Sequence, residues 1–202
     1  MTRTRKPDGR KKSLNRTVNK RELRQRFLIV CEGEKTEPFY FKRFRVPKAI
    51  VQVVGIGANT ISLVRKAIEL KQESDYDQVW CVFDKYSFPV ENFNNALSLA
   101  RRHKIKVAYS NEAFELWYLL HFNYHDSAMS RDTYKSRLSK QLGFTYKKND
   151  PNMYDLLEDK QRDAIRNATR LLQGYGDQHR PAYDNPCTTV HHLVQALNQT
   201  AV

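Results

Sequence analysis

The amino-acid sequence predicts an α/β fold with a four-stranded parallel sheet flanked by helices and followed by a C-terminal helical extension. Two patterns predict it. Four short apolar segments alternate with segments whose apolar residues recur at helical spacing, and this alternation is typical of parallel sheets covered on both faces. After Asn123 the alternation stops and only helical patterns follow, which places a boundary near residue 125.

The predicted strands are continuous apolar runs that end at polar residues or glycine. They cover residues 27–31, 50–54, 79–83 and 105–109. The first helix between the strands covers residues 39–44, with Thr36 as its cap and Pro38 just inside it. Asn59 or Thr60 opens the second helix. The other two cover residues 91–103 and 113–122. Because parallel crossovers are right-handed, the carboxyl ends of all four strands are expected at one edge of the sheet.

The C-terminal part is predicted to be helical throughout. Its helices cover residues 131–142 and 152–174, and Asn185-Pro186 caps a final helix. We therefore divide the chain into a basic arm (1–25), an α/β core (26–125) and a helical extension (126–202) that packs on the core.

The composition indicates a soluble protein of a reducing compartment. Hydrophobic residues make up 40% of the 202 residues, enough for a sizeable core. No apolar run approaches the roughly 20 residues of a membrane helix, and the charged N-terminus lacks the apolar stretch of a secretory signal. Cys31, Cys81 and Cys187 form an odd and widely spaced set, which argues against a disulfide scaffold. We expect a cytoplasmic protein without membrane contacts.

The positive charge is concentrated at the N-terminus. Residues 1–26 hold eleven Lys or Arg side chains against Asp8 and Glu22, in a chain whose net charge is +13. Such an arm has little apolar surface to bury and is expected to be disordered in isolation. Because contacts to phosphates release counterions, nucleic acid is the expected partner, with Arg10, Lys11 and Lys12 among the contacts. The simpler interpretation is that the arm only aids solubility.

Carboxylates stand where the predicted strands end. Glu32 follows the first strand, with Glu34 and Glu37 close behind it, and Asp84 follows the third. Several carboxylates at one sheet edge repel one another unless a cation lies between them, and Mg²⁺ binds carboxylate oxygens. Complementation of helix dipoles accounts for Glu37 but poorly for Glu32 and Asp84, which precede the helices. The sequence therefore predicts an Mg²⁺ or Mn²⁺ site at Glu32 and Asp84, with Glu34, Glu37 and Glu115 as further candidate ligands.

Basic side chains and two histidines complete the set of candidates. Lys85 or Lys35 is placed to stabilise negative charge on a phosphate in the transition state, and Lys147 and Lys148 are further candidates for nucleic-acid contacts. The simpler interpretation of each lysine is a solvated surface charge. The other candidates are His121 and His191, for which a packed histidine in the core or at a helix end is the simpler interpretation.

Four motifs, spread from about residue 26 to 198, carry a resemblance to a known family. They are Val30-Cys31-Glu32-Gly33-Glu34-Lys35-Thr36-Glu37-Pro38, then Val79-Trp80-Cys81-Val82-Phe83-Asp84, then Ser110-Asn111 with Phe114-Glu115-Leu116-Trp117-Tyr118-Leu119-Leu120-His121-Phe122, and finally Asn185-Pro186 with Thr188-Thr189-Val190-His191. In these motifs the sequence resembles the RloB-like family, a compact member of the Toprim superfamily.

The resemblance implies more than the residues alone do. It implies a Toprim-like four-stranded parallel sheet, a carboxylate site for Mg²⁺, and phosphodiester chemistry of the kind found in topoisomerases, primases and related nucleases. In such proteins Glu32 is the position of a metal ligand or of a general base. The resemblance also implies a setting in bacterial restriction or mobile loci, often beside an ATPase, and a role in defence against phage by abortive infection.

One position departs from the Toprim pattern. That pattern has an Asp-x-Asp after the third strand, and here Asp84 matches the first Asp while Tyr86 stands in place of the second. Tyrosine does not replace a carboxylate as a ligand of a hard cation at neutral pH. Either Glu34, Glu37 or Glu115 completes the ligand set, or the metal site is weakened.

Three functions stay open on the sequence alone. The first is a metal-dependent nuclease that hydrolyses DNA or RNA, transfer RNA included, with Glu32, Asp84, Glu37 and Lys85 as the catalytic candidates. The second is a nucleic-acid-binding or regulatory subunit whose Toprim site has degenerated at Tyr86. The third is an interaction protein that partners an ATPase and is toxic only when released.

Overall fold

The computed structural model describes residues 25–44, 51–57, 60–85 and 89–200. The predicted basic arm, including Arg10, Lys11 and Lys12, lies outside the described residues apart from its last residue, and so does Tyr86. None of the helices in the described part of the chain combines the length and the apolar character that a membrane span requires.

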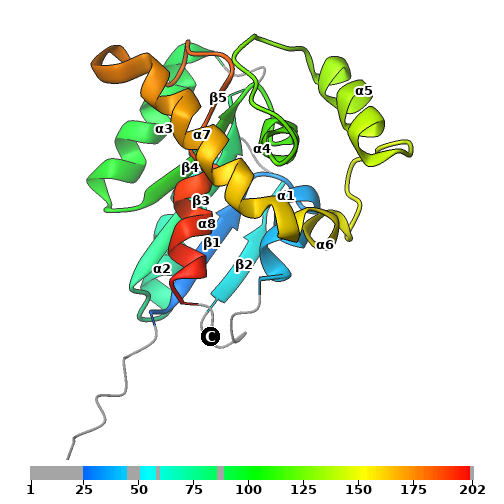
Figure 1. The fold of residues 1–202 in the computed structure, drawn as a ribbon. Coiled ribbons are helices and arrows are strands. Elements are labelled where there is room, and N and C mark those ends of the chain that lie inside the picture. Colours follow the sequence, from blue (N-terminus) through cyan, green and yellow to red (C-terminus); the bar gives the residue numbers. More distant parts are fainter. Residues whose placement is uncertain (1–24, 45–50, 58–59, 86–88, 201–202) are drawn as a thin grey trace, which may run out of the picture.

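Five strands form one sheet in the order β2-β1-β3-β4-β5 (Figure 1). The first four run parallel: β1 (Phe27–Cys31), β2 (Val51–Gly55), β3 (Gln78–Asp84) and β4 (Lys106–Asn111). The register of the central pair, β1 and β3, places Cys31 beside Val82. The residue after Cys31 therefore lies next to the end of β3.

Helices cover both faces of the sheet. Those that connect the parallel strands are α1 (Thr36–Lys42), α2 (Thr60–Glu73) and α3 (Val90–Arg102). After β4 come α4 (Glu115–Leu120), α5 (Arg131–Leu142), α6 (Met153–Leu157), η1 (Glu158–Lys160), α7 (Gln161–Tyr175), η2 (Gly176–Gln178) and, behind β5, α8 (Val190–Asn198). Figure 1 shows α7 and α8 crossing the sheet on the near side.

Alternate residues of the strands build two hydrophobic cores, because successive side chains of a strand point to opposite faces. Leu28 and Val30 of β1 pack with α2 and α3. Phe27 and Ile29 pack on the other face, in a larger cluster that includes residues of α1, α4, α5, α6, α7 and α8. The helices after residue 125 therefore share one core with the central strand, while the proposed division of the chain there stays a prediction.

The fifth strand, β5 (Cys187–Thr188), corrects the predicted four-stranded sheet. It pairs antiparallel with β4, with Ser110 opposite Thr188. Asn185-Pro186 accordingly leads into a strand, and Thr189 rather than this dipeptide precedes α8. A two-residue strand has no alternation of polar and apolar residues, so no pattern in the sequence indicates it. The predicted α/β class with a mostly parallel, helix-flanked sheet is confirmed.

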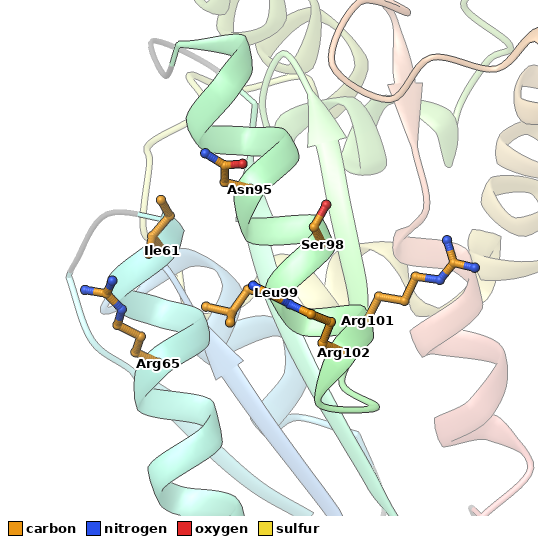
Figure 2. A pocket seen from close by; sticks show the side chains of 7 residues that line it. All are labelled: Ile61, Arg65, Asn95, Ser98, Leu99, Arg101 and Arg102. Atoms are coloured by element: carbon orange, nitrogen blue, oxygen red, sulfur yellow. The ribbon is translucent and has the colours of Figure 1, made fainter.

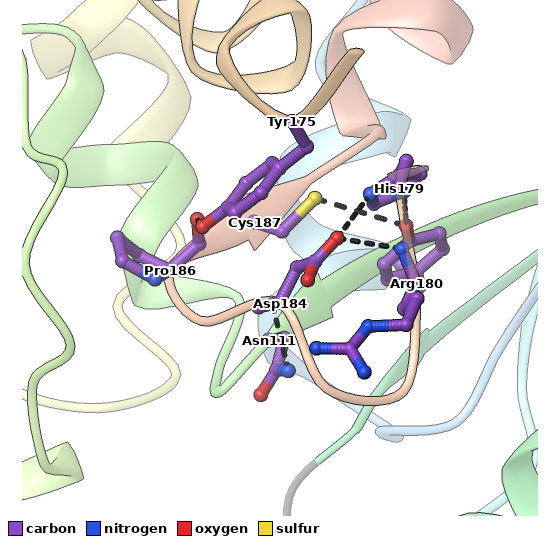
Figure 3. A network of polar contacts seen from close by, with 8 residues as sticks. Asn111, Tyr175, His179, Arg180, Asp184, Pro186 and Cys187 are labelled. Carbon is purple, nitrogen blue, oxygen red and sulfur yellow. Dashed lines mark hydrogen bonds and ion pairs between the residues drawn. The ribbon is translucent and has the colours of Figure 1, made fainter. Parts of the chain in front are cut away.

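A polar network holds the segment before β5 against β4 (Figure 3). Asp184 Oδ2 accepts a hydrogen bond of 2.6 Å from the Arg180 backbone N–H and lies 2.7 Å from His179 Nδ1. Asn111 Nδ2 donates to the Asp184 carbonyl over 2.9 Å, and Tyr109 Oη lies 2.7 Å from His179 Nε2. These contacts hold the segment before β5 against the C-terminal end of β4, at the carboxyl edge of the sheet.

Candidate active site

Glu32 and Asp84 meet at the carboxyl edge of the sheet. Glu32 directly follows β1, and its backbone N–H continues the ladder by donating to the Val82 carbonyl over 2.8 Å. The backbone N–H of Asp84, at the end of β3, donates to Glu32 Oε2 over 3.1 Å. The two acids come together because β1 and β3 are neighbours in the sheet and both strands end there.

Two helices add carboxylates to the same place. Glu37 comes from the first turn of α1 and Glu115 from the first turn of α4, and both side chains are buried. Glu37 packs against the backbone of Gly33, where even one added methyl group would collide with its carboxylate. Glu115 Oε1 accepts a hydrogen bond of 3.2 Å from Tyr146 Oη. Glu32, Asp84, Glu37 and Glu115 are called the carboxylate cluster below.

The carboxylates destabilise one another's charge. Burial raises the pKa of Asp84 well above its usual value, and Glu37, Glu115 and Glu32 raise it further. Burial also raises the pKa of Glu37, and Glu115 adds to the increase. The pKa of Glu32 rises to about 7, mainly through burial, although the hydrogen bond from Asp84 lowers it. The cluster is therefore a site where positive charge is strongly favoured.

Basic side chains partly supply that charge. Arg131, at the start of α5, forms an ion pair with Asp84 at 3.5 Å between Nη2 and Oδ2, and it lowers the pKa of that acid. Lys148 lowers the pKa values of Glu32 and Glu37. No pattern in the sequence indicated Arg131, which lies 47 residues from Asp84 and directly follows the helix-capping Ser130.

A cavity of about 390 Å³ opens beside the cluster. It is lined by Gly33, Glu34, Lys35, Thr36, Glu37, Lys148 and Asn149. Thr36 Oγ1 donates to Asn149 Oδ1 over 2.6 Å and so ties the start of α1 to the loop between α5 and α6. The cavity thus combines carboxylates with the ammonium groups of Lys35 and Lys148, which suits a ligand that carries phosphate and metal together.

The donor chemistry of the cluster fits a hard cation. Glu37 Oε2 is buried and finds no hydrogen-bond partner among the described residues, and a cation would relieve the mutual repulsion of the four carboxylates. Within the described residues, however, no three His, Cys, Asp or Glu side chains are already grouped to hold one ion. Binding would therefore require these side chains to turn toward the ion.

The other predicted site residues lie in different settings. Glu34 is exposed and lies over Gly57, whose φ of +57° and close approach to Glu34 Oε1 leave no room for a side chain. Lys85 is half-buried after β3, and its backbone N–H donates to the Ser110 carbonyl over 2.8 Å. Lys147 is exposed and is not among the residues that line the cavity.

The two histidines are buried, His121 directly after the end of α4 and His191 within α8. His121 packs edge-on against the Trp117 ring with Nδ1 2.9 Å from the Trp117 carbonyl, and burial lowers its pKa to about 4. The His191 ring lies tilted against the His192 ring, with 4.0 Å between their centroids, and burial lowers the pKa of His191 to about 3. Both rings are therefore neutral at physiological pH, and these contacts are the packing expected of core histidines.

Comparison with known proteins assigns the family. The family model described as RloB-like protein matches residues 27–197. The chain belongs to the RloB-like family. The match extends from β1 into α8, so it includes the whole carboxylate cluster and Arg131. No curated protein and no solved structure matches the chain significantly.

Proposed function

We propose that this RloB-like protein is a metal-dependent nuclease of Toprim type that hydrolyses phosphodiester bonds of DNA or RNA in bacterial defence against phage. The observation that carries the proposal is the contact between Glu32 and Asp84 at neighbouring strand ends, with the buried Glu37 and Glu115 behind them. The defence role follows from the family resemblance alone.

The residues of the chain suit this chemistry. Glu32 has two alternative roles: it serves as a ligand of the metal or, with a pKa of about 7 in the metal-free protein, it accepts a proton from an attacking water. Lys35, Lys148 and Arg131 surround the cluster with positive charge, which favours the phosphate and the charge that develops on it. Glu32, Asp84 and Glu37 would hold Mg²⁺ or Mn²⁺, and the bound ion would activate water and neutralise the phosphate.

A second candidate function is that of a nucleic-acid-binding subunit with a degenerate site, partnering an ATPase. The ion pair between Arg131 and Asp84 favours it, because an arginine there already balances one carboxylate that a metal would use. The replacement of the second Toprim aspartate by Tyr86 favours it as well.

Cleavage assays distinguish the two functions. Purified protein is incubated with plasmid, single-stranded DNA and total RNA, with Mn²⁺ or with EDTA. The nuclease predicts cleavage that requires the metal and falls at least about a hundredfold in Glu32→Gln and Asp84→Asn, while the exposed Glu91→Gln keeps full activity. Binding without cleavage in wild type, together with metal-dependent cleavage by Tyr86→Asp, would instead establish the degenerate site.

A further inference from the structure

A second cleft lies on the sheet face opposite to α7 and α8. It has a volume of about 680 Å³ and runs between α2 and α3, which pack side by side (Figure 2). Arg65 of α2 and Arg101 and Arg102 of α3 line it and are all exposed. We call this feature the arginine cleft. It shares no lining residue with the cavity beside the carboxylate cluster.

The arginines of the cleft have no partner in the described part of the chain. No hydrogen bond or ion pair joins the guanidinium group of Arg65, Arg101 or Arg102 to any described residue. The acid nearest to Arg65 in helical spacing, Glu69, pairs with Lys66 at 3.0 Å instead. These uncompensated guanidinium groups face solvent, and Figure 2 shows that Arg65 and Arg101 extend outward on either side of the cleft rather than into it.

Helix stability does not explain this arrangement. Arg101 and Arg102 lie in the last turn of α3, where a cation complements the helix dipole. Arg65, by contrast, lies toward the N-terminal end of α2, whose last turn carries Lys71 instead. The helix dipole thus accounts for Arg101 and Arg102, but it does not account for the presence of Arg65 at the same cleft.

The remaining lining residues suit an extended phosphate ligand. Asn95 and Ser98 of α3 add neutral hydrogen-bond donors along the same cleft, and the half-buried Leu99 forms part of its lining. On a helix, Asn95 and Arg102 are about 10 Å apart along the axis, so the polar lining extends well beyond the width of a single phosphate group. Guanidinium groups bind phosphate oxygens in pairs of hydrogen bonds.

We infer that the arginine cleft binds the phosphodiester backbone of a nucleic acid. This inference rests on the proposed function, since it names a surface that holds the substrate away from the reacting bond. α2 and α3 follow β2 and β3 directly, so their N-terminal ends lie at the carboxyl edge that carries Glu32 and Asp84. A strand bound along the cleft is thereby directed toward the carboxylate cluster.

The test compares two triple variants of the full chain. The cleft variant carries Arg65→Gln, Arg101→Gln and Arg102→Gln. The control carries Arg162→Gln, Arg166→Gln and Arg170→Gln, which removes three exposed arginines of α7 on the other face for the same change in net charge. Binding to a labelled duplex DNA and a labelled single-stranded RNA is followed by fluorescence anisotropy in EDTA over a range of salt concentrations.

The cleft variant is expected to bind about tenfold more weakly than the control. Its plot of log K against the logarithm of the salt concentration is expected to be less steep, with a slope smaller in magnitude by about 2 to 3. Single Arg65→Glu, which changes one exposed side chain, is expected to weaken binding about fivefold with an unchanged melting temperature. Equal affinity and slope in the two triple variants, or no effect of Arg65→Glu, would overturn the inference. Because the assay contains no divalent metal, its outcome is independent of whether the protein cleaves.

Discussion

At the scale of single residues, the defining feature is a carboxylate whose ionisation opposes the folded state at neutral pH. Burial is the main reason why the pKa of Glu32 rises from its ordinary value of 4.5 to about 7 in the folded protein. The folded protein therefore holds this proton more tightly than the unfolded chain does. Between those two values the unfolded chain deprotonates first, so the free energy of unfolding falls as pH rises.

We predict that metal-free protein loses stability between pH 4.5 and about 7 and that Asp84 and Glu37, whose pKa values are also raised, add to the loss. The shift of Glu32 alone corresponds to on the order of 3 kcal/mol, which partial exposure reduces to about 2 kcal/mol. Urea unfolding in EDTA at several pH values measures it. Glu32→Gln should flatten the curve, and a stability that rises with pH across this window would refute the account.

At the scale of elements, the site depends on how closely β2 approaches the loop between β1 and α1. A Cβ atom at Gly55 would lie 2.5 Å from the Gly33 carbonyl oxygen, 2.7 Å from Glu34 Cα and 2.9 Å from Pro38 Cγ. These atoms belong to the segment that carries Glu34 and Glu37. Side-chain bulk on the edge strand therefore displaces the backbone that positions the carboxylates.

Gly55→Ala is predicted to destabilise the protein by about 1–3 kcal/mol and to abolish metal-dependent cleavage, because the neighbouring backbone must shift. Gly174→Ala in α7 is the matched control, since nothing lies within 4 Å of the added Cβ. That control should gain up to about 1 kcal/mol from helix propensity. Thermal melts and cleavage assays of both variants check the prediction, which fails if Gly55→Ala behaves like the control.

The sequence predicted elements well where local chemistry defines them. The helix at 131–142 agrees at both ends because Ser130 accepts the capping hydrogen bond from Thr133 N and Gly143 takes a left-handed conformation with φ +77°. The helix predicted at 152–174 is instead divided by η1. Thr36, the predicted cap, is the first residue of α1, which ends at Lys42 rather than at residue 44.

The candidate site was predictable only in part. The right-handed crossovers predicted Glu32 and Asp84 at one edge of the sheet, whereas the adjacency of β1 and β3, which brings the two acids into contact, is known only from the structure. Arg131, Tyr146 and Asn149 reach the site from a segment whose path over the sheet depends on tertiary packing, and no local pattern encodes that path. The roles of all these residues in catalysis stay predictions.

At the scale of the whole molecule, one hydrophobic cluster joins the central strand to the last helix. It contains Ile29 of β1, Trp117 of α4 and Leu197 of α8, all fully buried. Parts that share a core lose it together, so we expect the α/β core and the C-terminal helices to unfold as one unit.

We predict that urea unfolding followed by tryptophan fluorescence and by far-ultraviolet circular dichroism gives coincident transitions. Leu197→Ala should shift both by about 2–4 kcal/mol, because it leaves a cavity in the shared core. The exposed Leu156→Ala, with 44% of its surface accessible, should change stability by less than about 0.5 kcal/mol. Two separate transitions would show that residues 126–202 form an independent domain.

The central claim is that the carboxylates at the ends of β1 and β3 take up a divalent cation, and calorimetric titration with Mn²⁺ at a pH near the pKa of Glu32 tests it most directly. We predict saturable binding by wild type, release of protons because the pKa of Glu32 is about 7, and loss of binding in Glu32→Gln and Asp84→Asn but not in Glu91→Gln. Absence of binding in wild type, or equal binding in Glu32→Gln, would contradict the account.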